Sequence, residues 1–185
     1  MFPAFDFRNT VYVIMINLTL ALAAFGKDVF LAAYLGTSSE ADVFLLSYFV
    51  VDTIGNNLIA TALGVACLPV FAQWHVHSER QLFIQTVRST VFFSLILTGF
   101  LALLMWVERG LILTMFGGKW PHSILELGML VFSIILPALI IFPLLAIGTS
   151  ILQVYSKFII PALAPVLFNL VFFVSLKMGL LLFFL

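Results

Sequence analysis

The stretch Ala23-Ala-Phe-Gly-Lys-Asp-Val-Phe-Leu-Ala-Ala-Tyr-Leu-Gly36 places two ionisable side chains, Lys27 and Asp28, inside an apolar run of membrane length. A charged side chain at the centre of a bilayer costs from a few to more than about ten kcal/mol, so charges at this depth usually serve a function. We therefore expect a membrane protein whose ionisable residues face an internal cavity.

The composition of the whole chain supports a membrane location. Hydrophobic residues make up 64% of the chain and charged residues only 9%, whereas about a quarter of the residues of a soluble domain are charged. The long apolar runs lack the alternation of polar and apolar residues that a membrane β-barrel requires. The sequence predicts an all-α, polytopic bundle of about five transmembrane helices, in a single transmembrane domain over residues 1–185.

The charge balance and the motifs exclude several functions. The 8 basic and 8 acidic residues cancel, which argues against a nucleic-acid partner because such a partner requires a basic surface. The chain has no Gly-x-Ser-x-Gly or His-Glu-x-x-His motif, so we expect no enzyme activity and no cofactor. His75 and His77 lack further metal ligands nearby, and we expect them in a solvated loop rather than a metal site.

Apolar runs give the bounds of the expected helices. We predict transmembrane helices at about residues 10–35, 41–73, 89–107, 123–155 and 160–176, with an apolar tail at 178–185. The first run lacks a cleavage site and is expected to stay in the protein as a helix. The end of the chain within apolar sequence suggests a fragment of a longer protein.

The basic residues between the helices give a small bias in orientation. With the N-terminus in the cytoplasm, four basic residues flank the helices on that side and three on the other, as the positive-inside rule favours. The cytoplasmic set is Arg8, Arg80, Arg88 and Lys157, and the opposite set is Arg109, Lys119 and Lys177. We expect a cytoplasmic N-terminus.

The polar residues of the first helix form a pattern. Asn17, Ala21, Ala24 and Asp28 follow at spacings of four, three and four, so they share one helical stripe that suits close helix contact or a cavity wall. Lys27 should point about 100° away from Asp28 and not face it directly. Alternatively, Lys27 extends its stem along the helix toward the membrane surface.

The turn after the first helix contains a third acidic candidate. Gly36 should end the first helix, and Ser38 or Ser39 should cap the next one. Glu40 and Asp42 then lie in the first turn, where a negative charge complements the helix dipole. For Asp42, this structural role and a role in the cavity both remain open.

The second helix is interrupted by the polar sequence Asp52-Thr-Ile-Gly-Asn-Asn57. Asp52 and Asn56 are four residues apart and share a face of a helix. So many polar groups at mid-membrane depth are tolerated only against protein or a water-filled cavity. This stretch therefore predicts an internal polar cavity.

The remaining helices show fewer polar groups. Helix 89–107 is nearly uniformly apolar, and we expect it to be structural and lipid-facing. Residues 111–116 are too few to span the membrane and should lie at its surface. Pro137 and Pro143 should interrupt the fourth helix.

Four blocks of this sequence carry a resemblance to a known family. They are Gly26-Lys-Asp-Val-Phe-Leu-Ala-Ala-Tyr-Leu-Gly36, Ala41-Asp-Val-Phe44, Leu68-Pro-Val-Phe71 and Ile151-Leu-Gln-Val-Tyr-Ser-Lys-Phe-Ile-Ile-Pro-Ala-Leu-Ala-Pro-Val-Leu-Phe-Asn169. With them the chain resembles the lipid II flippase family (MurJ/MviN type) of the multidrug/oligosaccharidyl-lipid/polysaccharide transporter superfamily. The last block is the most specific.

The resemblance implies a fold and a function. Members of the family are fourteen-helix bundles with two lobes and a central cationic cavity, so this chain would form part of the N-terminal lobe. They move lipid II, the peptidoglycan precursor, across the bacterial cytoplasmic membrane. The implied partners are membrane lipid, the lipid-linked oligosaccharide substrate and the missing C-terminal helices on another chain. The resemblance also implies that Lys27 replaces a cavity arginine and that Asp28 and Asp42 occupy acidic positions of the family.

The chain departs from the family where arginines are usual. It reads Ala21-Leu-Ala-Ala24 in the first helix and Gly55-Asn56 and Ala60-Thr61 in the second. A lysine also lacks the bidentate phosphate grip of an arginine. The expected cavity is therefore nearly neutral, with the candidate lining residues Lys27, Asp28, Asp42, Asp52 and Asn56. The alternative is a truncated, non-transporting membrane remnant or scaffold protein.

Overall fold

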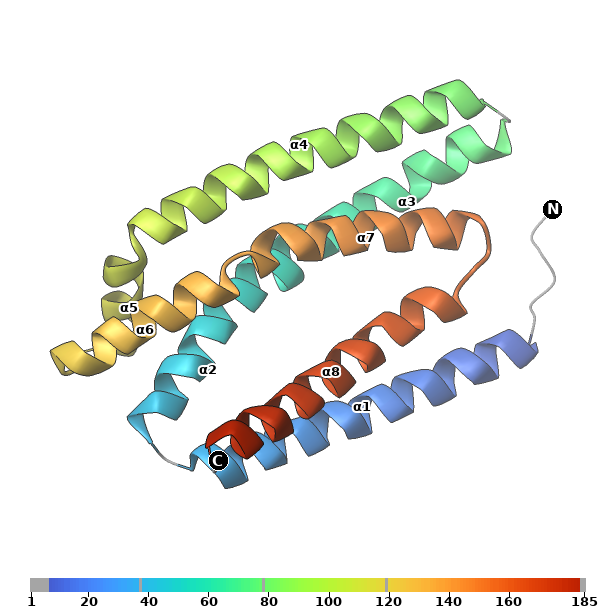
Figure 1. Cartoon of the computed structure of the whole chain (residues 1–185). Helices are drawn as coiled ribbons and strands as arrows, with labels where there is room; N and C mark the ends of the chain where they lie inside the picture. The colour runs from blue at the N-terminus through green and yellow to red at the C-terminus, as the bar shows by residue number, and fades with distance from the viewer. Residues whose placement is uncertain (1–6, 37, 78, 119, 184–185) are drawn as a thin grey trace. The chain divides into compact units, whose positions relative to one another are not determined.

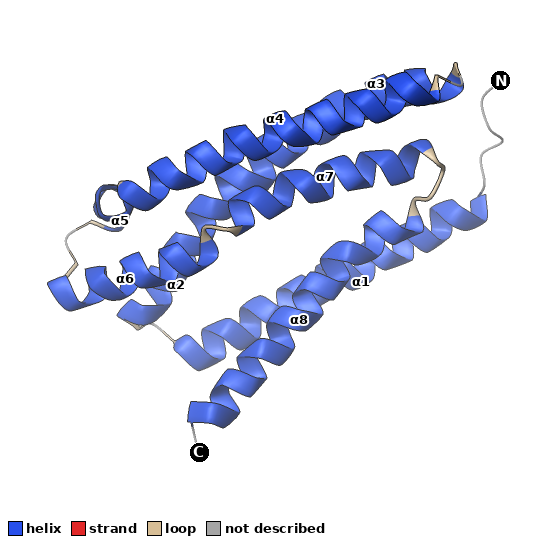
Figure 2. Ribbon diagram, turned by 45° about the horizontal axis from the view of Figure 1, so that its top comes forward, coloured by secondary structure: helices blue, strands red, loops and turns tan. Residues whose placement is uncertain are grey.

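The computed structural model describes residues 7–36, 38–77, 79–118 and 120–183, and these residues form helices joined by short turns (Figures 1 and 2). The described part of the chain contains no strand. The chain divides into two compact units, one made of Met1–Gly36 with Tyr155–Leu185 and the other of Thr37–Val154. Each unit is described by itself below.

The first unit is a pair of long helices. Helix α1 spans Phe7–Leu35 and packs along α8, which spans Ile159–Phe183 (Figure 1). Helix α1 ends where predicted, because Gly36 adopts a φ of 58°, in the left-handed region that glycine enters at little cost.

The second unit contains the remaining helices. Helix α2 (Ser39–Asp52), the π-helix η1 (Thr53–Ala60) and helix α3 (Thr61–Val76) follow one another without a loop. They are followed by α4 (Arg80–Val107), α5 (Arg109–Gly117), α6 (His122–Ile135) and α7 (Ala138–Val154). Helix α2 packs against α5 and α6, while α3 packs against α4 and α7, and η1 contacts α7.

Two hydrophobic clusters hold the second unit together. The larger cluster joins α2, α4, α5, α6 and the start of α7, and its buried members are Val50, Val51, Met105, Leu113, Phe132, Leu136 and Leu139. The smaller cluster joins α3 and α7 through buried Cys67, Phe71 and Ile147, with side chains of α4 packed against it. Burial of such side chains is the main contribution to stability in water, and close packing takes over that role in lipid.

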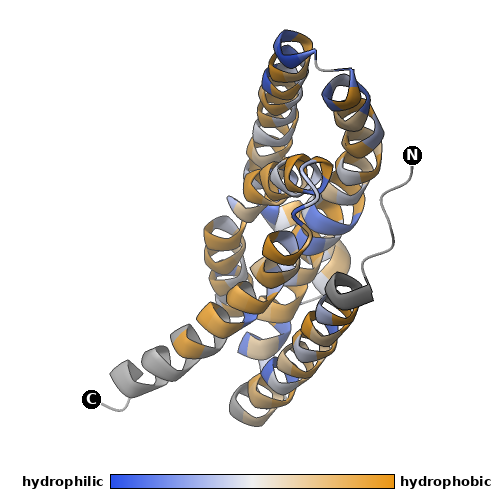
Figure 3. Ribbon diagram, turned by 90° about the vertical axis from the view of Figure 1, so that its right-hand side faces the viewer, coloured by the Kyte–Doolittle hydropathy of each residue, from blue (hydrophilic) through white to orange (hydrophobic). Residues whose placement is uncertain are grey.

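Four helical segments among the described residues are long and apolar enough to cross a membrane. They are Ile14–Ala33, Ser39–Val76, Arg80–Val107 and His122–Val154. In Figure 3 the hydrophobic colour runs along much of the helical ribbon. The prediction of an all-α, polytopic membrane bundle is confirmed.

Several predicted boundaries were wrong. Helix α4 begins at Arg80 rather than at 89, and α3 continues to Val76, so most of the expected loop between them is helical. Helix α8 continues to Phe183 and includes most of the predicted apolar tail, whose last two residues lie outside the described part. Apolarity marks only the part of a helix inside the bilayer, whereas backbone hydrogen bonds continue into the polar ends.

The prolines differ in their effects. Pro137 lies in the break between α6 and α7, where Leu139 N–H donates to the Leu136 carbonyl at 3.0 Å in a tight turn. Pro143, which was also expected to interrupt the helix, lies inside α7. Pro143 is fully buried, and surrounding protein can hold a helix together where one backbone bond is lost.

The short apolar segment 111–116 belongs to α5. This helix has nine residues, too few to cross the hydrocarbon core. Its location at the membrane surface stays a prediction.

Candidate functional site

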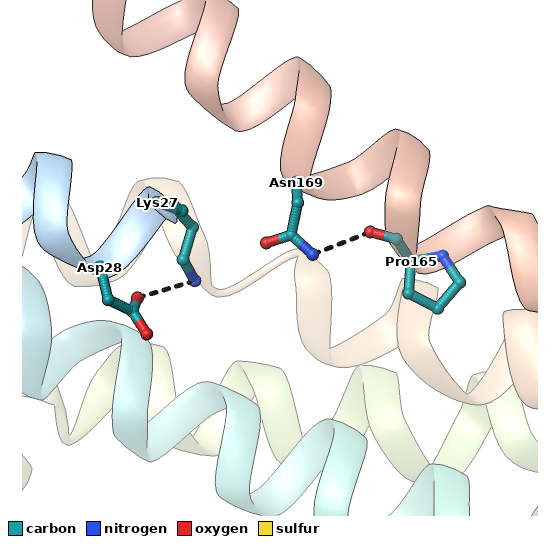
Figure 4. A network of polar contacts seen from close by, with 4 residues as sticks. All are labelled: Lys27, Asp28, Pro165 and Asn169. Atoms are coloured by element: carbon teal, nitrogen blue, oxygen red, sulfur yellow. Dashed lines mark hydrogen bonds and ion pairs between the residues drawn. The ribbon is translucent and has the colours of Figure 1, made fainter. Parts of the chain in front are cut away.

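The two charges of α1 form an ion pair. Lys27 Nζ lies 3.4 Å from Asp28 Oδ1 (Figure 4). The Lys27 side chain is only 15% exposed, while that of Asp28 is 68% exposed. The expectation that the two side chains do not face each other was wrong, because the long lysine stem bends across the angle between adjacent helix positions.

The face of α1 that is least exposed to solvent is not the face that was predicted to make close contacts. The least exposed stripe contains Leu20, Ala23, Lys27 and Leu31, again at spacings of three and four. By contrast, three of the four residues that were expected to form a close contact or a cavity wall are exposed, namely Asn17, Ala21 and Asp28, and the fourth, Ala24, is half-buried. Lys27 therefore belongs to the covered face of α1 and Asp28 to the exposed face.

Helix α8 adds a buried polar residue to the same unit. Asn169 is 8% exposed and its Nδ2 donates a hydrogen bond of 2.9 Å to the Pro165 carbonyl (Figure 4). Asn169 was not among the candidate site residues predicted from the sequence. A single amide within a strongly apolar helix is the signal that could have identified it.

Asp42 takes the position that its sequence context predicted. Ser38 is the N-cap of α2, with its Oγ accepting a hydrogen bond of 3.2 Å from Ala41 N–H. Glu40 and Asp42 lie in the first turn. Asp42 is exposed. This geometry supports stabilisation of the helix dipole by Asp42.

Asp52 is the centre of the most extensive polar cluster in the second unit. Its carboxylate accepts two side-chain hydrogen bonds, one from Asn56 Nδ2 to Oδ1 and one from Asn57 Nδ2 to Oδ2, each of 3.1 Å. Asp52 is half-buried, and both asparagines are exposed. In the part of the chain that the structure describes, no basic side chain forms an ion pair with Asp52. Two amide groups thus bind this carboxylate.

The π-helix explains why Asn57 was missed. In an α-helix, residues five apart point about 140° away from each other, so only Asn56 was expected beside Asp52. The i→i+5 hydrogen bonds of a π-helix bring the fifth residue back to the same side. The dense run of polar residues with a glycine was the available signal for an irregular helix.

Helix α4 is less uniform than predicted. Thr86, Thr90, Ser94 and Thr98 lie four residues apart, and Ser94 and Thr98 are buried. Because this face packs toward α3 and α7, the prediction that the helix is simply lipid-facing was incomplete. The spacing of four between these hydroxyl residues was the available signal in the sequence. The many apolar residues between them made the helix look uniformly apolar.

A groove of about 530 Å³ runs between α4 and the η1–α3 segment. Its lining residues are uncharged: Ile59, Leu63, Gln85, Thr86, Ser89, Thr90, Phe93, Ser94 and Leu97. The groove can accommodate apolar and hydrogen-bonding groups, but its lining supplies no charge for an anionic group.

The candidate residues offer hydrogen bonding more than cationic charge. Asp52, Asn56 and Asn57 can bind hydroxyl, amide or cationic groups. Lys27 supplies a positive charge that Asp28 offsets at 3.4 Å. An arginine would grip a phosphate with two parallel hydrogen bonds, and neither candidate cluster contains one.

Comparison with known proteins identifies the family. The family model described as Lipid II flippase MurJ matches residues 31–181. The chain belongs to this family. It is 22% identical over 165 residues to the probable lipid II flippase MurJ of Buchnera aphidicola subsp. Schizaphis graminum, and 29% identical over 161 residues to the lipid II flippase MurJ of Thermosipho africanus.

The chain spans about a third of the length of these relatives. The two alignments cover 88% and 83% of this chain but 32% of each relative. No solved structure gives a significant match. The family match includes Asp42, Asp52 and Asn56, while Lys27 and Asp28 precede it.

Proposed function

We propose that this chain is the N-terminal part of a lipid-linked oligosaccharide flippase, which moves lipid II across the bacterial cytoplasmic membrane. The observation that carries the proposal is the match of residues 31–181 to the lipid II flippase family. The four membrane-length helical segments among the described residues support it. In this proposal the N-terminus lies in the cytoplasm and the remaining helices are supplied by a further polypeptide segment or a second chain.

The proposed substrate path contains Lys27, Asp28, Asp42, Asp52 and Asn56. The support is strongest for Asp52, whose carboxylate and bound amides lie within a helical segment of 38 residues, more than enough to cross a bilayer. Polar groups at that depth require protein or water around them. That these five residues share one cavity stays a prediction.

The family and the polar groups favour transport rather than catalysis. A flippase needs a polar path for a headgroup and no bond-breaking machinery, and Asp52 with its two amides can provide such a path. The zero net charge of the chain gives no support for binding nucleic acid. We propose membrane lipid and a lipid-linked oligosaccharide as the partners.

A non-transporting membrane remnant or scaffold is the second candidate. The ion pair between Lys27 and Asp28 favours it, because the charge that would meet a pyrophosphate is offset. Lys27 is also the one lysine or arginine between Arg8 and Arg80 in the sequence. A scaffold would retain the packed helices without the cationic cavity.

Complementation of a flippase-depleted bacterium separates the two candidates. The chain is produced together with the C-terminal helices of the Thermosipho africanus relative as a second polypeptide, and growth is measured. Restored growth that Asp52→Ala abolishes and Glu126→Ala preserves supports transport. Correct membrane insertion of both polypeptides without restored growth supports the scaffold. Glu126 is an exposed residue of α6 and serves as the control.

A further inference from the structure

Two long helices of the second unit are interrupted at the same level. The helix Ser39–Val76 contains the π-helix η1 at Thr53–Ala60. The helical segment His122–Val154 breaks between α6 and α7, at Leu136 and Pro137. Helix η1 contacts α7, so the irregular parts of the two segments lie beside each other.

Gly55 lies at a close contact between η1 and α7. A Cβ atom at Gly55 would lie 3.0 Å from Phe142 Cδ2 and 3.3 Å from Leu139 Cα. Gly55 is buried. The absence of a side chain therefore lets the backbone of η1 lie directly against the start of α7, just after the proline break.

The two hydrophobic clusters lie on opposite sides of this level. Val50 and Val51 precede η1 and pack in the larger cluster with Leu136. Cys67 and Phe71 follow η1 and pack in the smaller one. Each half of the unit thus has its own packed core, and the η1–α7 contact lies between the two.

One hydrogen bond of the Asp52 carboxylate has the residue spacing of a π-helix. The carboxylate's hydrogen bond to Asn57 joins residues five apart, which the 3.6-residue turn of an α-helix would separate by about 140°. Its bond to Asn56 joins residues four apart, a spacing at which side chains are neighbours in an ordinary α-helix. Breaking the Asn57 bond therefore weakens the π register selectively.

A second hydrogen bond between residues five apart lies at the C-terminal end of η1. The Thr61 hydroxyl donates to the Asn56 carbonyl at 3.1 Å, again across five residues. The Thr61 backbone N–H also donates to that carbonyl. Side chains at both ends of η1 thus favour the wide turn.

The Ser39–Val76 helix changes direction between α2 and α3 (Figure 1). We infer that η1, together with the break at Leu136 and Pro137, is a hinge between the two halves of the second unit, and that the Asp52–Asn57 hydrogen bond holds it in this bent, π-helical state. Release of this bond lets η1 adopt α-helical turns and straightens the Ser39–Val76 helix. π-helical turns often occur at functional sites in membrane and soluble helices. A hinge here would change the shape of the unit whether or not the chain transports lipid II.

The distance between spin labels on either side of η1 tests the hinge. The full chain in lipid nanodiscs carries Cys67→Ala and labelled cysteines at Leu45 and Val70, both exposed. These positions are 25 residues apart, so a straight α-helix would separate their backbones by about 37 Å. A control pair at Ile84 and Leu104 lies on α4, which has no interruption.

Two matched variants separate the hinge from general loosening. Asn57→Ala should shift the Leu45–Val70 distances toward about 37 Å, or add a second population there. Asn56→Ala should leave the parent distribution in place, because the bond that it removes is compatible with α-helical turns. The control pair on α4 should keep one narrow distribution in both variants.

Three results would overturn the hinge. The Leu45–Val70 distribution could stay unchanged in Asn57→Ala, the two asparagine variants could change it equally, or the α4 pair could change along with it. None of these measurements depends on transport, so a failure of the proposed flippase function would leave this test intact.

Discussion

Asp52 accepts hydrogen bonds from two side-chain amides, and its removal should cost stability as well as function. A hydrogen bond to a charged group contributes about 1.5–3 kcal/mol when the charge is shielded from water. Since Asn56 and Asn57 are exposed, we expect Asp52→Ala to lower the free energy of unfolding by about 1–2 kcal/mol, near or below the lower limit of that range. Unfolding of the chain in detergent with increasing denaturant would measure the loss.

Asp42→Ala is the control for this prediction. Asp42 is exposed at the start of α2, where its interaction with the helix dipole contributes about 0.3–1 kcal/mol. An equal loss in the two variants would mean that the amide bonds of Asp52 contribute nothing beyond a surface charge.

Two glycines in the same long helix offer a second matched comparison. A Cβ at Gly55 would lie 3.0–3.3 Å from atoms of Phe142 and Leu139, whereas nothing lies within 4 Å of a Cβ at Gly64. Added volume in a tight contact costs about 1–3 kcal/mol. We expect Gly55→Ala to be less stable than Gly64→Ala by about that amount, measured by the same unfolding experiment. Equal stabilities would show that α7 moves away from η1 without cost.

Sequence patterns predicted the residue types of the site better than its contacts. Asp52 and Asn56 were predicted to share a face of the helix, and in the structure their side chains are hydrogen-bonded to each other. Asn57 was missed because the spacing rules assume α-helical turns. The Lys27–Asp28 ion pair was missed because the side-chain torsions of a lysine do not follow from its position on the helix.

At the scale of single elements, the start of α2 depends on a side-chain cap. Ser38 Oγ accepts a hydrogen bond from Ala41 N–H, whereas Ser39 is already the first helical residue. Loss of a serine cap costs about 0.5–2 kcal/mol. We expect Ser38→Ala to lower stability by about 1 kcal/mol and Ser39→Ala to have little effect, in thermal unfolding monitored by circular dichroism. The reverse order would assign the cap to Ser39.

The sequence predicts turns and helix caps better than it predicts which face of a helix is buried. Gly36 and Ser38 act through their own backbone or nearest neighbours, so the turn between α1 and α2 was predicted correctly. The covered stripe of α1 depends on which partner helix packs against it, and the apolar residues on several faces of α1 left that choice open. The buried position of Ser94 likewise comes from tertiary packing, since its neighbours in sequence are apolar.

At the scale of the whole molecule, the order of membrane-length segments predicts which loops share a side. If each of the four segments crosses once, Glu79 lies on the side of the N-terminus and Gly118 lies on the opposite side. Cysteines introduced at these two positions in a Cys67→Ala background should react with a membrane-impermeant reagent from opposite sides of the membrane. With a cytoplasmic N-terminus, Gly118→Cys reacts in intact cells. Reaction of both from one side would contradict the crossings.

Membership of the lipid II flippase family rests on residues 31–181 and not on the charge pair of α1. The match over residues 31–181 includes the polar cluster at Asp52 but begins after Lys27. The second unit contains the interrupted helix, while the first contains the offset charge pair. Polar groups with little net cationic charge suit hydroxyl and amide partners better than a pyrophosphate.

The most direct test measures the appearance of lipid II on the outer face of the cytoplasmic membrane. Cells depleted of their own flippase produce the chain with the C-terminal helices of the Thermosipho africanus relative, and an enzyme added outside cleaves whatever lipid II is exposed. We expect cleaved product with the parent chain and at least about tenfold less with Asp52→Ala, as loss of about 1.4 kcal/mol of interaction would give. Background cleavage with the parent chain, when both polypeptides are inserted in the membrane, would contradict the flippase function.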